Sequence, residues 1–306
     1  MMKILLVNHT QQQCGVYQYG KRVSDILIND KRYNFYYYET DTSLDFIKKI
    51  NELSPDVIIY NWHGSTMKWL TFEITNNLKD KKQLFIFHES IFPSNFKTDG
   101  FIMCDIHEDE KNKKFSIPRP IFEIKTKKIQ NDIPIIGSFG FGFENKGFEK
   151  ICQLVNSSFD RAIIHLHITN AFFGDKYGVI SNRVIERCKS IITNKNIELV
   201  ITTNFMSNDE ILDFLNKNTV NIFLYDNMPG RGLSSTIDYA VSVDTPLIVN
   251  NSNMFRHLLS DRPEISIENN SINDILNMGI ESVRHFRKKW SNDEMRDKFY
   301  KILQKI

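Results

Sequence analysis

A glycine-rich stretch near the middle of the chain constrains the fold more than any other part of this sequence. Residues 134–154 read PIIGSFGFGFENKGFEKICQL. A short apolar run enters a loop with four glycines and a lysine, and the apolar residues after it recur at helical spacing. The loop residues of interest are Gly137, Gly140, Gly142, Lys146 and Gly147. A strand, a glycine loop and a helix in this order present backbone N–H groups and a helix N-terminus to a phosphate group. Because the stretch lies at mid-chain, we expect a second α/β unit to begin here.

Short apolar runs alternate with longer amphipathic segments along the whole chain. The expected strands cover residues 3–8, 35–38, 57–60, 83–87, 100–104, 134–138, 163–168, 197–202, 220–224 and 246–250. The expected helices cover residues 16–29, 43–53, 67–78, 149–155, 178–192, 207–216, 233–242, 254–259 and much of 272–306, and nothing regular is predicted directly after Glu108. This alternation is typical of parallel sheets with right-handed crossover connections. The polar segment 117–134 separates two such series, so the sequence predicts an α/β protein with two Rossmann-like domains that face a central cleft.

The composition excludes several classes of protein. The 306 residues are 41% hydrophobic and 25% charged, and the net charge of +2 gives no reason to expect a nucleic-acid partner. No stretch approaches the roughly 20 apolar residues of a membrane span, and the N-terminal apolar run is too short for a signal peptide. The four cysteines have no metal-ligand spacing, which predicts free thiols and no metal site. We therefore expect a cytoplasmic protein and leave peripheral contact with a membrane open.

Glycine follows the first expected strand as well. The segment 14–20 reads CGVYQYG, and Gly15 would let the backbone approach a ligand at a helix N-terminus. The alternative is a tight turn from strand to helix. The segment is not the GxGxxG fingerprint of dinucleotide-binding proteins.

Histidines stand at the ends of two neighbouring strands. His63 follows the run VIIYNW, and His88 follows FIF. Ligands bind at the carboxyl ends of strands in open α/β sheets, so we expect both histidines near the substrate. His88 would donate a proton or a hydrogen bond, with Glu89 tuning its pKa. The alternative for each is a structural histidine. His165 and His167 alternate within a strand, and we expect them to pack on one face.

A fourth constellation lies in residues 226–238, DNMPGRGLSSTID. Arg231 offers a planar, permanently charged fork suited to a diphosphate. Asp238, in the first turns of the following helix, could accept hydrogen bonds from ribose hydroxyls. The alternative is a capped helix with a surface arginine. A Walker A loop, an acidic DxD pair and a GxSxG elbow are all missing from the sequence.

Together these motifs resemble GT-B glycosyltransferases of the large retaining group exemplified by bacterial GT4-type enzymes. Gly15 resembles that group's N-terminal glycine loop, and His63 in NWHG and His88 in FHES resemble its acceptor-side histidines. Lys146 in ENKGF matches its phosphate-binding lysine. Residues 232–249, GLSSTIDYAVSVDTPLIV, resemble the helix and strand that normally read GLPxxEAMAxGxPVV.

Two departures from that pattern concern the donor chemistry. Ser138 stands where the group usually has an arginine, and both glutamates of its E-x7-E signature are missing. Pro229 or Asp226 lies near the first glutamate position, and Asp238 is the acidic residue nearest to the second, out of strict register. Donor chemistry is therefore either rearranged, with Arg231 replacing the arginine, or lost.

The resemblance implies an acceptor-binding domain at 1–130, a nucleotide-sugar-binding domain at 131–285, and a helix at 286–306 that crosses back to the first domain. It implies a metal-independent, retaining glycosyltransferase of surface polysaccharide assembly, without a cofactor and with a UDP- or GDP-sugar as co-substrate and a glycan or lipid-linked acceptor. The expected catalytic residues are His63 and His88. The expected donor-binding residues are Gly15, Gly140, Gly142, Lys146, Arg231, Gly232, Leu233, Ser234 and Asp238. A catalytically inactive GT-B-like partner subunit and a sugar-nucleotide epimerase are the alternatives.

Overall fold

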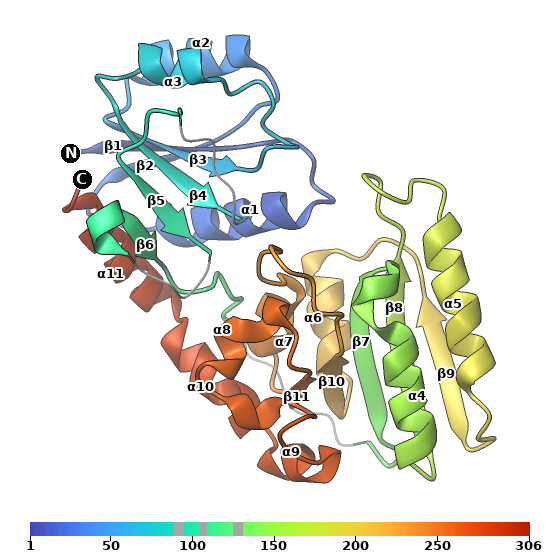
Figure 1. The fold of residues 1–306 in the computed structure, drawn as a ribbon. Coiled ribbons are helices and arrows are strands. Elements are labelled where there is room, and N and C mark those ends of the chain that lie inside the picture. The colour runs from blue at the N-terminus through green and yellow to red at the C-terminus, as the bar shows by residue number, and fades with distance from the viewer. Residues whose placement is uncertain (89–94, 105–108, 125–130) are drawn as a thin grey trace. The chain divides into compact units, whose positions relative to one another are not determined.

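The chain forms two compact α/β units. The structure, a computed structural model, describes residues 1–88, 95–104, 109–124 and 131–306 (Figure 1). Unit 1 comprises Met1–Pro120, Gly230–Leu233 and Lys289–Ile306. Unit 2 comprises Ile121–Pro229 and Ser234–Lys288.

Unit 1 contains a six-stranded parallel sheet. Its strands are β1 (Lys3–Asn8), β2 (Asn34–Glu39), β3 (Val57–Trp62), β4 (Lys82–Phe87), β5 (Gly100–Met103) and β6 (Lys114–Ser116), in the order β2-β1-β3-β4-β5-β6. β1 and β3 are neighbours, with Val7 opposite Tyr60, so the residues that follow these strands emerge side by side. The same holds for β3 and β4, where Trp62 is opposite Phe87.

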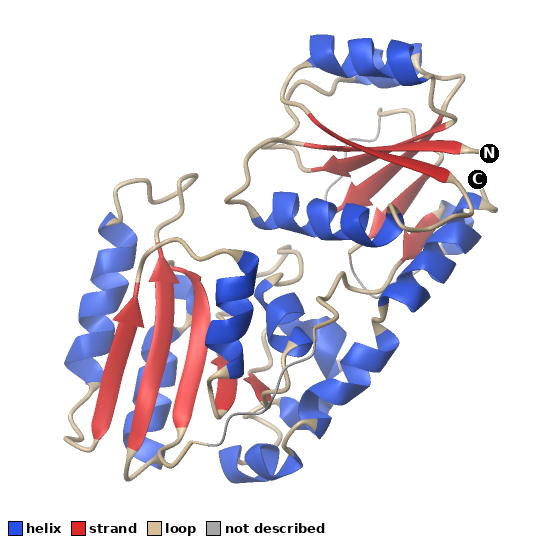
Figure 2. Cartoon of the chain, turned by 180° about the vertical axis from the view of Figure 1, so that it is seen from behind, coloured by secondary structure: helices blue, strands red, loops and turns tan. Residues whose placement is uncertain are grey.

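Helices cover both faces of this sheet (Figures 1 and 2). One face packs on α1 (Gly15–Leu27) and α11 (Asn292–Leu303), and the other packs on α2 (Ser43–Leu53) and α3 (Phe72–Asn77). The apolar residues of α1 lie on one side, where Tyr19 and Val23 are buried, which is why this segment forms an amphipathic helix.

Helix α11 belongs to the core of unit 1 although it follows all of unit 2 in the chain. Met295, Phe299, Ile302 and Leu303 are buried in the same apolar cluster as Ile4 of β1. The Phe299 ring lies 6.1 Å from the ring of Tyr33. Trp290, just before this helix, is buried as well.

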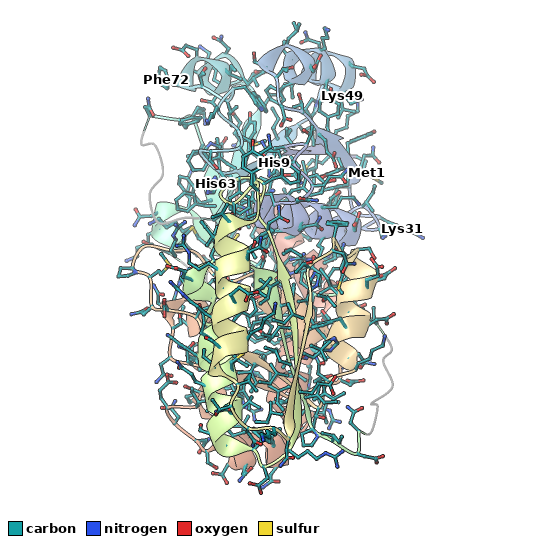
Figure 3. All side chains as sticks on the ribbon, turned by 90° about the vertical axis from the view of Figure 1, so that its right-hand side faces the viewer. Met1, His9, Lys31, Lys49, His63 and Phe72 are labelled. Carbon is teal, nitrogen blue, oxygen red and sulfur yellow. The ribbon has the colours of Figure 1, made fainter. Side chains whose placement is uncertain are left out.

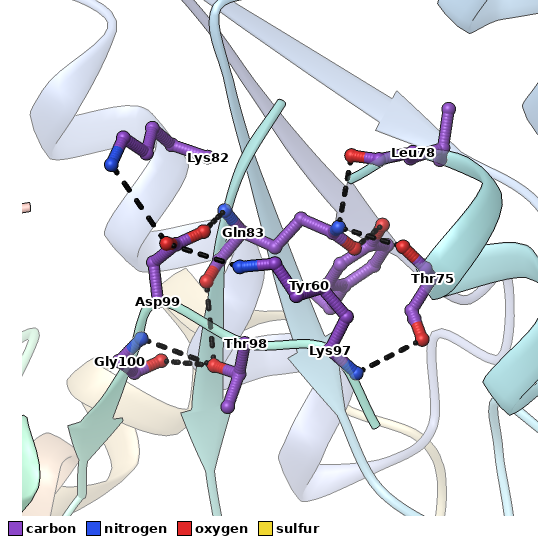
Figure 4. Close-up of polar contacts among 9 residues, drawn as sticks. All are labelled: Tyr60, Thr75, Leu78, Lys82, Gln83, Lys97, Thr98, Asp99 and Gly100. Atoms are coloured by element: carbon purple, nitrogen blue, oxygen red, sulfur yellow. Dashed lines mark hydrogen bonds and ion pairs between the residues drawn. The ribbon is translucent and has the colours of Figure 1, made fainter. Parts of the chain in front are cut away.

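A buried polar network holds the amino edge of the unit 1 sheet (Figure 4). The Gln83 side chain donates to the carbonyls of Thr75 (2.9 Å) and Leu78 (3.1 Å), and it accepts from the Tyr60 hydroxyl at 3.0 Å. The Gln83 backbone N–H donates to Asp99 Oδ2 at 2.9 Å. These bonds tie β3, β4 and the end of α3 together, which leaves the opposite, carboxyl edge as the place for a site.

Unit 2 contains a five-stranded parallel sheet in the order β11-β10-β7-β8-β9. Its strands are β7 (Ile135–Phe141), β8 (Ala162–Thr169), β9 (Ile197–Thr202), β10 (Val220–Phe223) and β11 (Leu247–Val249). Its helices are α4 (Phe148–Ser158), α5 (Val179–Ile191), α6 (Asn208–Asn216), α7 (Thr236–Ser242), α8 (Arg256–Leu259), α9 (Ile272–Met278) and α10 (Glu281–Lys289). Residues from α4 and α5 bury one face of the sheet. On the other face the rings of His165 and His167 both lie against Phe214 of α6, which confirms the prediction that these histidines pack on one face.

Three sequence-based expectations were wrong. A short helical turn (Glu110–Asn112) and β6 follow Glu108, where nothing regular was expected, because β6 pairs with β5 and buries Phe115. Helix α3 begins at Phe72, since the Thr71 hydroxyl accepts from the Ile74 N–H as an N-cap. Helix α7 begins at Thr236 and not at residue 233. Ser234 belongs to the preceding loop, where its backbone N–H donates to the Met254 carbonyl.

Candidate functional site

The carboxyl edge of the unit 2 sheet is built on a glycine turn that no other residue could replace without strain. A short helical turn, Glu144–Lys146, follows β7 and ends at Gly147, whose φ is 69°. A Cβ at Gly147 would stand 1.9 Å from the carbonyl oxygen of Leu224. The close approach presses the loop against the chain that leaves β10 and fixes where Lys146 points.

Lys146 lies over an aromatic ring at this edge. Its Nζ is 4.0 Å from the centroid of the Tyr225 ring, and Tyr225 is buried. The Tyr225 hydroxyl is 2.9 Å from Thr236 Oγ1, which is in turn 2.7 Å from Ser234 Oγ. The ring orients the ammonium group but leaves its full positive charge.

Lys146 pairs with no carboxylate in the part of the chain that the structure describes. A neighbouring lysine on α4 behaves differently, because Lys150 Nζ bonds Asp226 Oδ1 at 2.5 Å. A half-buried, uncompensated cation beside hydroxyl groups and a glycine turn can bind an anionic group such as a diphosphate.

Two of the predicted glycines have different surroundings. Gly140 has φ 155°, and a Cβ there would lie 3.8 Å from the Tyr225 hydroxyl, so Gly140 belongs to the Lys146 group. Gly142 is a packing residue, since a Cβ there would stand 2.4 Å from Cβ of Ser181 in α5.

The remaining donor-binding candidates do not all join this group. Ser234 does, through Thr236. Asp238 is fully buried in α7 and does not reach solvent, so the structure does not offer it to a ribose. Arg231 is exposed, and the segment Gly230–Leu233 groups with unit 1.

A polar network fills the carboxyl edge of the unit 1 sheet. Asn61, at the end of β3, donates from Nδ2 to Asn8 Oδ1 (2.8 Å) and to the Val16 carbonyl (2.7 Å). Its Oδ1 is 2.7 Å from His88 Nε2, so His88 donates there. The other ring nitrogen, Nδ1, is 3.4 Å from Cys104 Sγ and accepts from that thiol.

These contacts make His88 a neutral imidazole with both nitrogens engaged. Burial, reinforced by Arg119, lowers the pKa of His88 to about 3. Its carbonyl oxygen is also approached closely within unit 1, since a Cβ on Gly232 would stand 2.2 Å away. Glu89, expected to tune His88, lies outside the described residues. The catalytic role of His88 stays a prediction.

A second histidine, missed from the sequence, stands beside His63 at this edge. His9 follows β1 as His63 follows β3, and Figure 3 labels both. Nδ1 of His9 accepts from the Gln11 N–H (3.1 Å) and Nδ1 of His63 accepts from the Ser65 N–H (3.2 Å), which leaves the proton on Nε2 in each neutral ring. Nε2 of the fully buried His9 has no partner among the described residues. Its signal in the sequence was its place directly after the first strand.

The first residue of α1 is Gly15, so the predicted glycine does stand at a helix N-terminus. Among the described residues, no group of three or more histidine, cysteine or acidic side chains is placed to hold a metal ion. Within the same residues, every helix is too short or too polar to cross a membrane.

Known protein structures share this fold, although no family model and no curated protein sequence matches the chain. A glycosyltransferase from Rickettsia africae ESF-5 superposes with a TM-score of 0.69 at 12% identity, over 99% of this chain and 98% of the other. HepE of Anabaena, solved with UDP and glucose, gives 0.63 at 11% identity over 100% of both chains. The N-terminal domain of Candida albicans trehalose-6-phosphate phosphatase gives 0.66 at 10% identity, over 100% of this chain and 97% of the other. At such identities the likeness establishes the fold, which is that of GT-B glycosyltransferases, with two Rossmann-like parts.

Proposed function

We propose that the protein is a glycosyltransferase that transfers a sugar from a nucleoside diphosphate donor. The observation that carries the proposal is the Lys146 ammonium, held on the Tyr225 ring without a carboxylate partner among the described residues. The GT-B fold and the UDP found with HepE support it. The alternative of an inactive partner subunit draws support from the buried Asp238 and the missing glutamates.

In the proposed reaction the donor diphosphate lies against Lys146 and the hydroxyl groups of Ser234 and Thr236. These groups stabilise the negative charge that develops on the diphosphate as the bond to the sugar breaks, which is the largest catalytic contribution in many enzymes. A cation in this place makes a metal ion unnecessary, and no other cofactor is needed. We propose retention at the sugar, a UDP- or GDP-linked donor, and a glycan or lipid-linked acceptor of surface polysaccharide assembly.

Unit 1 would hold the acceptor in this proposal. His63, whose Nδ1 accepts from the Ser65 N–H, would hydrogen-bond a sugar hydroxyl through its ring. His88 would position Asn61 at the same edge.

Calorimetry with UDP and GDP tests the donor site. Lys146→Ala should weaken binding of at least one of them by about 1.5–3 kcal/mol, the usual cost of losing a charge-assisted hydrogen bond. Lys150→Ala removes the same charge four residues further along the chain, in α4, but from a lysine paired with Asp226. It should therefore leave the affinity nearly unchanged. Equal losses in the two variants, or no binding to the wild type, would contradict the proposal.

A panel of nucleotide sugars tests the reaction itself. Release of UDP or GDP, measured by phosphate-coupled detection with an acceptor mixture, supports transfer. An epimerised sugar without released nucleotide would identify an epimerase, and donor binding without turnover would identify an inactive subunit.

Arg231 is a second candidate for the diphosphate. Because a lysine cannot reproduce the bidentate geometry of a guanidinium, Arg231→Lys should also weaken UDP or GDP binding. Equal affinity in the two proteins would show that Arg231 is not part of the donor site.

A further inference from the structure

Exposed aromatic side chains gather on two neighbouring loops of unit 2. The β8–α5 loop exposes Phe172 (62%), Phe173 (63%) and Tyr177 (82%), and the β9–α6 loop exposes Phe205 (65%). Val179 (60%), the first residue of α5, is exposed beside them. Single exposed apolar residues need no explanation, but a concentration on adjacent loops indicates a binding surface.

The β8–α5 loop is fixed although its rings are exposed. The buried Asp175 carboxylate accepts from the N–H groups of Ile180 (3.0 Å) and Ser181 (2.8 Å). The Phe173 ring lies 5.3 Å from the ring of Phe141 and 5.9 Å from that of Phe143. The start of α5 and the Phe173 ring are therefore held in place before a ligand binds.

A polar hollow of about 260 Å³ lies beside these rings. Its lining includes Asn170, Lys176, Tyr177, Ser181, Asn182 and Thr203, which come from both loops and the start of α5. The side chains of Asn182 and Thr203 make no hydrogen bond to any residue that the structure describes, so their donors and acceptors are available. The volume suits a single small ring.

The two charged side chains at the hollow have opposite signs, the Lys176 ammonium and the buried Asp175 carboxylate, so an anion gains little there over a neutral ligand. The Asp175 carboxylate already occupies the N–H groups at the start of α5, where a phosphate would otherwise bind. Lys176 lies over the Tyr177 ring, 5.6 Å from its centroid. A flat aromatic face beside amide and hydroxyl groups matches a sugar ring, which has an apolar C–H face and a rim of hydroxyls.

We propose that this hollow binds one residue of a neutral saccharide, with the sugar ring against Tyr177 and its hydroxyls bonded to Asn182 and Thr203. The inference goes beyond the proposed function, because neither Lys146 nor Tyr225 lines the hollow. It assigns unit 2 a contact with a glycan chain in addition to the donor.

Saturation-transfer NMR with maltotetraose, cellotetraose, xylotetraose and mannotetraose tests the site, each at about 10 mM, a range that captures weak binding. At least one should receive saturation. For that saccharide, Tyr177→Ala should raise the Kd about tenfold through the lost ring contact, and Tyr177→Phe should stay within about twofold. Phe72→Ala in unit 1 is the matched control, since it removes an exposed aromatic ring elsewhere (44% exposed) and should change nothing.

The outcomes are distinguishable from those of the donor experiment. Tyr177→Ala should keep the wild-type UDP or GDP affinity, and Lys146→Ala should keep the wild-type saccharide affinity. Absence of binding for all four saccharides, or equal Kd values for wild type and Tyr177→Ala, would overturn the inference whatever the donor result. So would binding to vesicles of phosphatidylglycerol that depends on Tyr177 while the saccharides fail, which would identify a membrane surface instead.

Discussion

In unit 1 the polar groups that follow the strands bond mainly to one another, whereas in unit 2 the corresponding edge keeps a charge uncompensated. Asn61 joins Asn8 and His88 into one network. The Lys146 ammonium lies over the Tyr225 ring, and it forms no ion pair with any carboxylate that the structure describes. The same parallel-sheet geometry thus produces an internally bonded edge in one unit and a positive edge, at Lys146, in the other. We infer that the unit 1 edge forms a fixed surface for the acceptor and that the unit 2 edge binds an anion.

The largest expected effect concerns the glycine turn that supports the positive edge. Gly147→Ala should lower the free energy of unfolding by about 3–5 kcal/mol, because the new Cβ would meet a backbone oxygen and the backbone would stay left-handed. Urea-induced unfolding measures this effect.

Gly178 supplies the matched control for that variant. Its φ of 72° resembles that of Gly147, but a Cβ there would find its nearest neighbour at an ordinary 3.5 Å. Gly178→Ala should therefore cost only the left-handed strain, about 1–2 kcal/mol. Equal costs would show that the contact with Leu224 does not constrain the turn.

A smaller effect is expected at the internally bonded edge of unit 1. Asn61→Ala should cost about 2–3 kcal/mol, because it leaves Nε2 of His88 without its acceptor and removes one hydrogen bond each from the Asn8 side chain and the Val16 carbonyl. Asn29→Ala removes an exposed amide that bonds one carbonyl and should cost less than about 1 kcal/mol. A cost below that of Asn29→Ala would mean that the network is not a support, and the comparison between the two edges would fail.

The smallest effect is a dependence of stability on pH. Because the folded-state pKa of His88 lies near 3, below the usual 6.5, the unfolded chain binds a proton that the folded chain does not. Stability should therefore be complete above about pH 6.5 and fall as the pH falls toward 3, by at most about 2 kcal/mol at pH 5 from this residue. Urea titrations at pH 7 and at pH 5 measure the loss of unfolding free energy between the two conditions. This loss should be smaller in His88→Asn than in the wild type. An equal loss would assign the acid sensitivity to other groups, such as His9, whose pKa is also lowered by burial.

The sequence predicted the elements well where a pattern is local. The strand at 197–202 and the helix at 43–53 have the predicted bounds, because alternation or helical spacing fills each segment and Thr42 caps the helix. β6 escaped prediction because three residues carry no usable periodicity and pairing with β5 decides their structure.

The candidate site was predictable in part for the same reason. Lys146 and Gly147 are neighbours in the chain, so their turn could be read from the sequence. Tyr225, which orients the lysine, comes from the end of another strand, and nothing local marks it as a partner. The burial of Asp238 likewise depends on how α7 packs, which a single sequence does not specify.

The placement of α11 has a consequence for synthesis. Unit 1 begins with the first strand of the chain, yet its core includes Phe299 and Leu303, which the ribosome adds only after unit 2. At about 5–20 residues per second, the nascent first unit waits on the order of ten seconds or more with part of its apolar surface uncovered. Unit 2, whose segments are nearly continuous, can close its own core in that interval. The nascent chain thus offers chaperones a defined exposed surface between β1 and α1, which disappears when α11 docks.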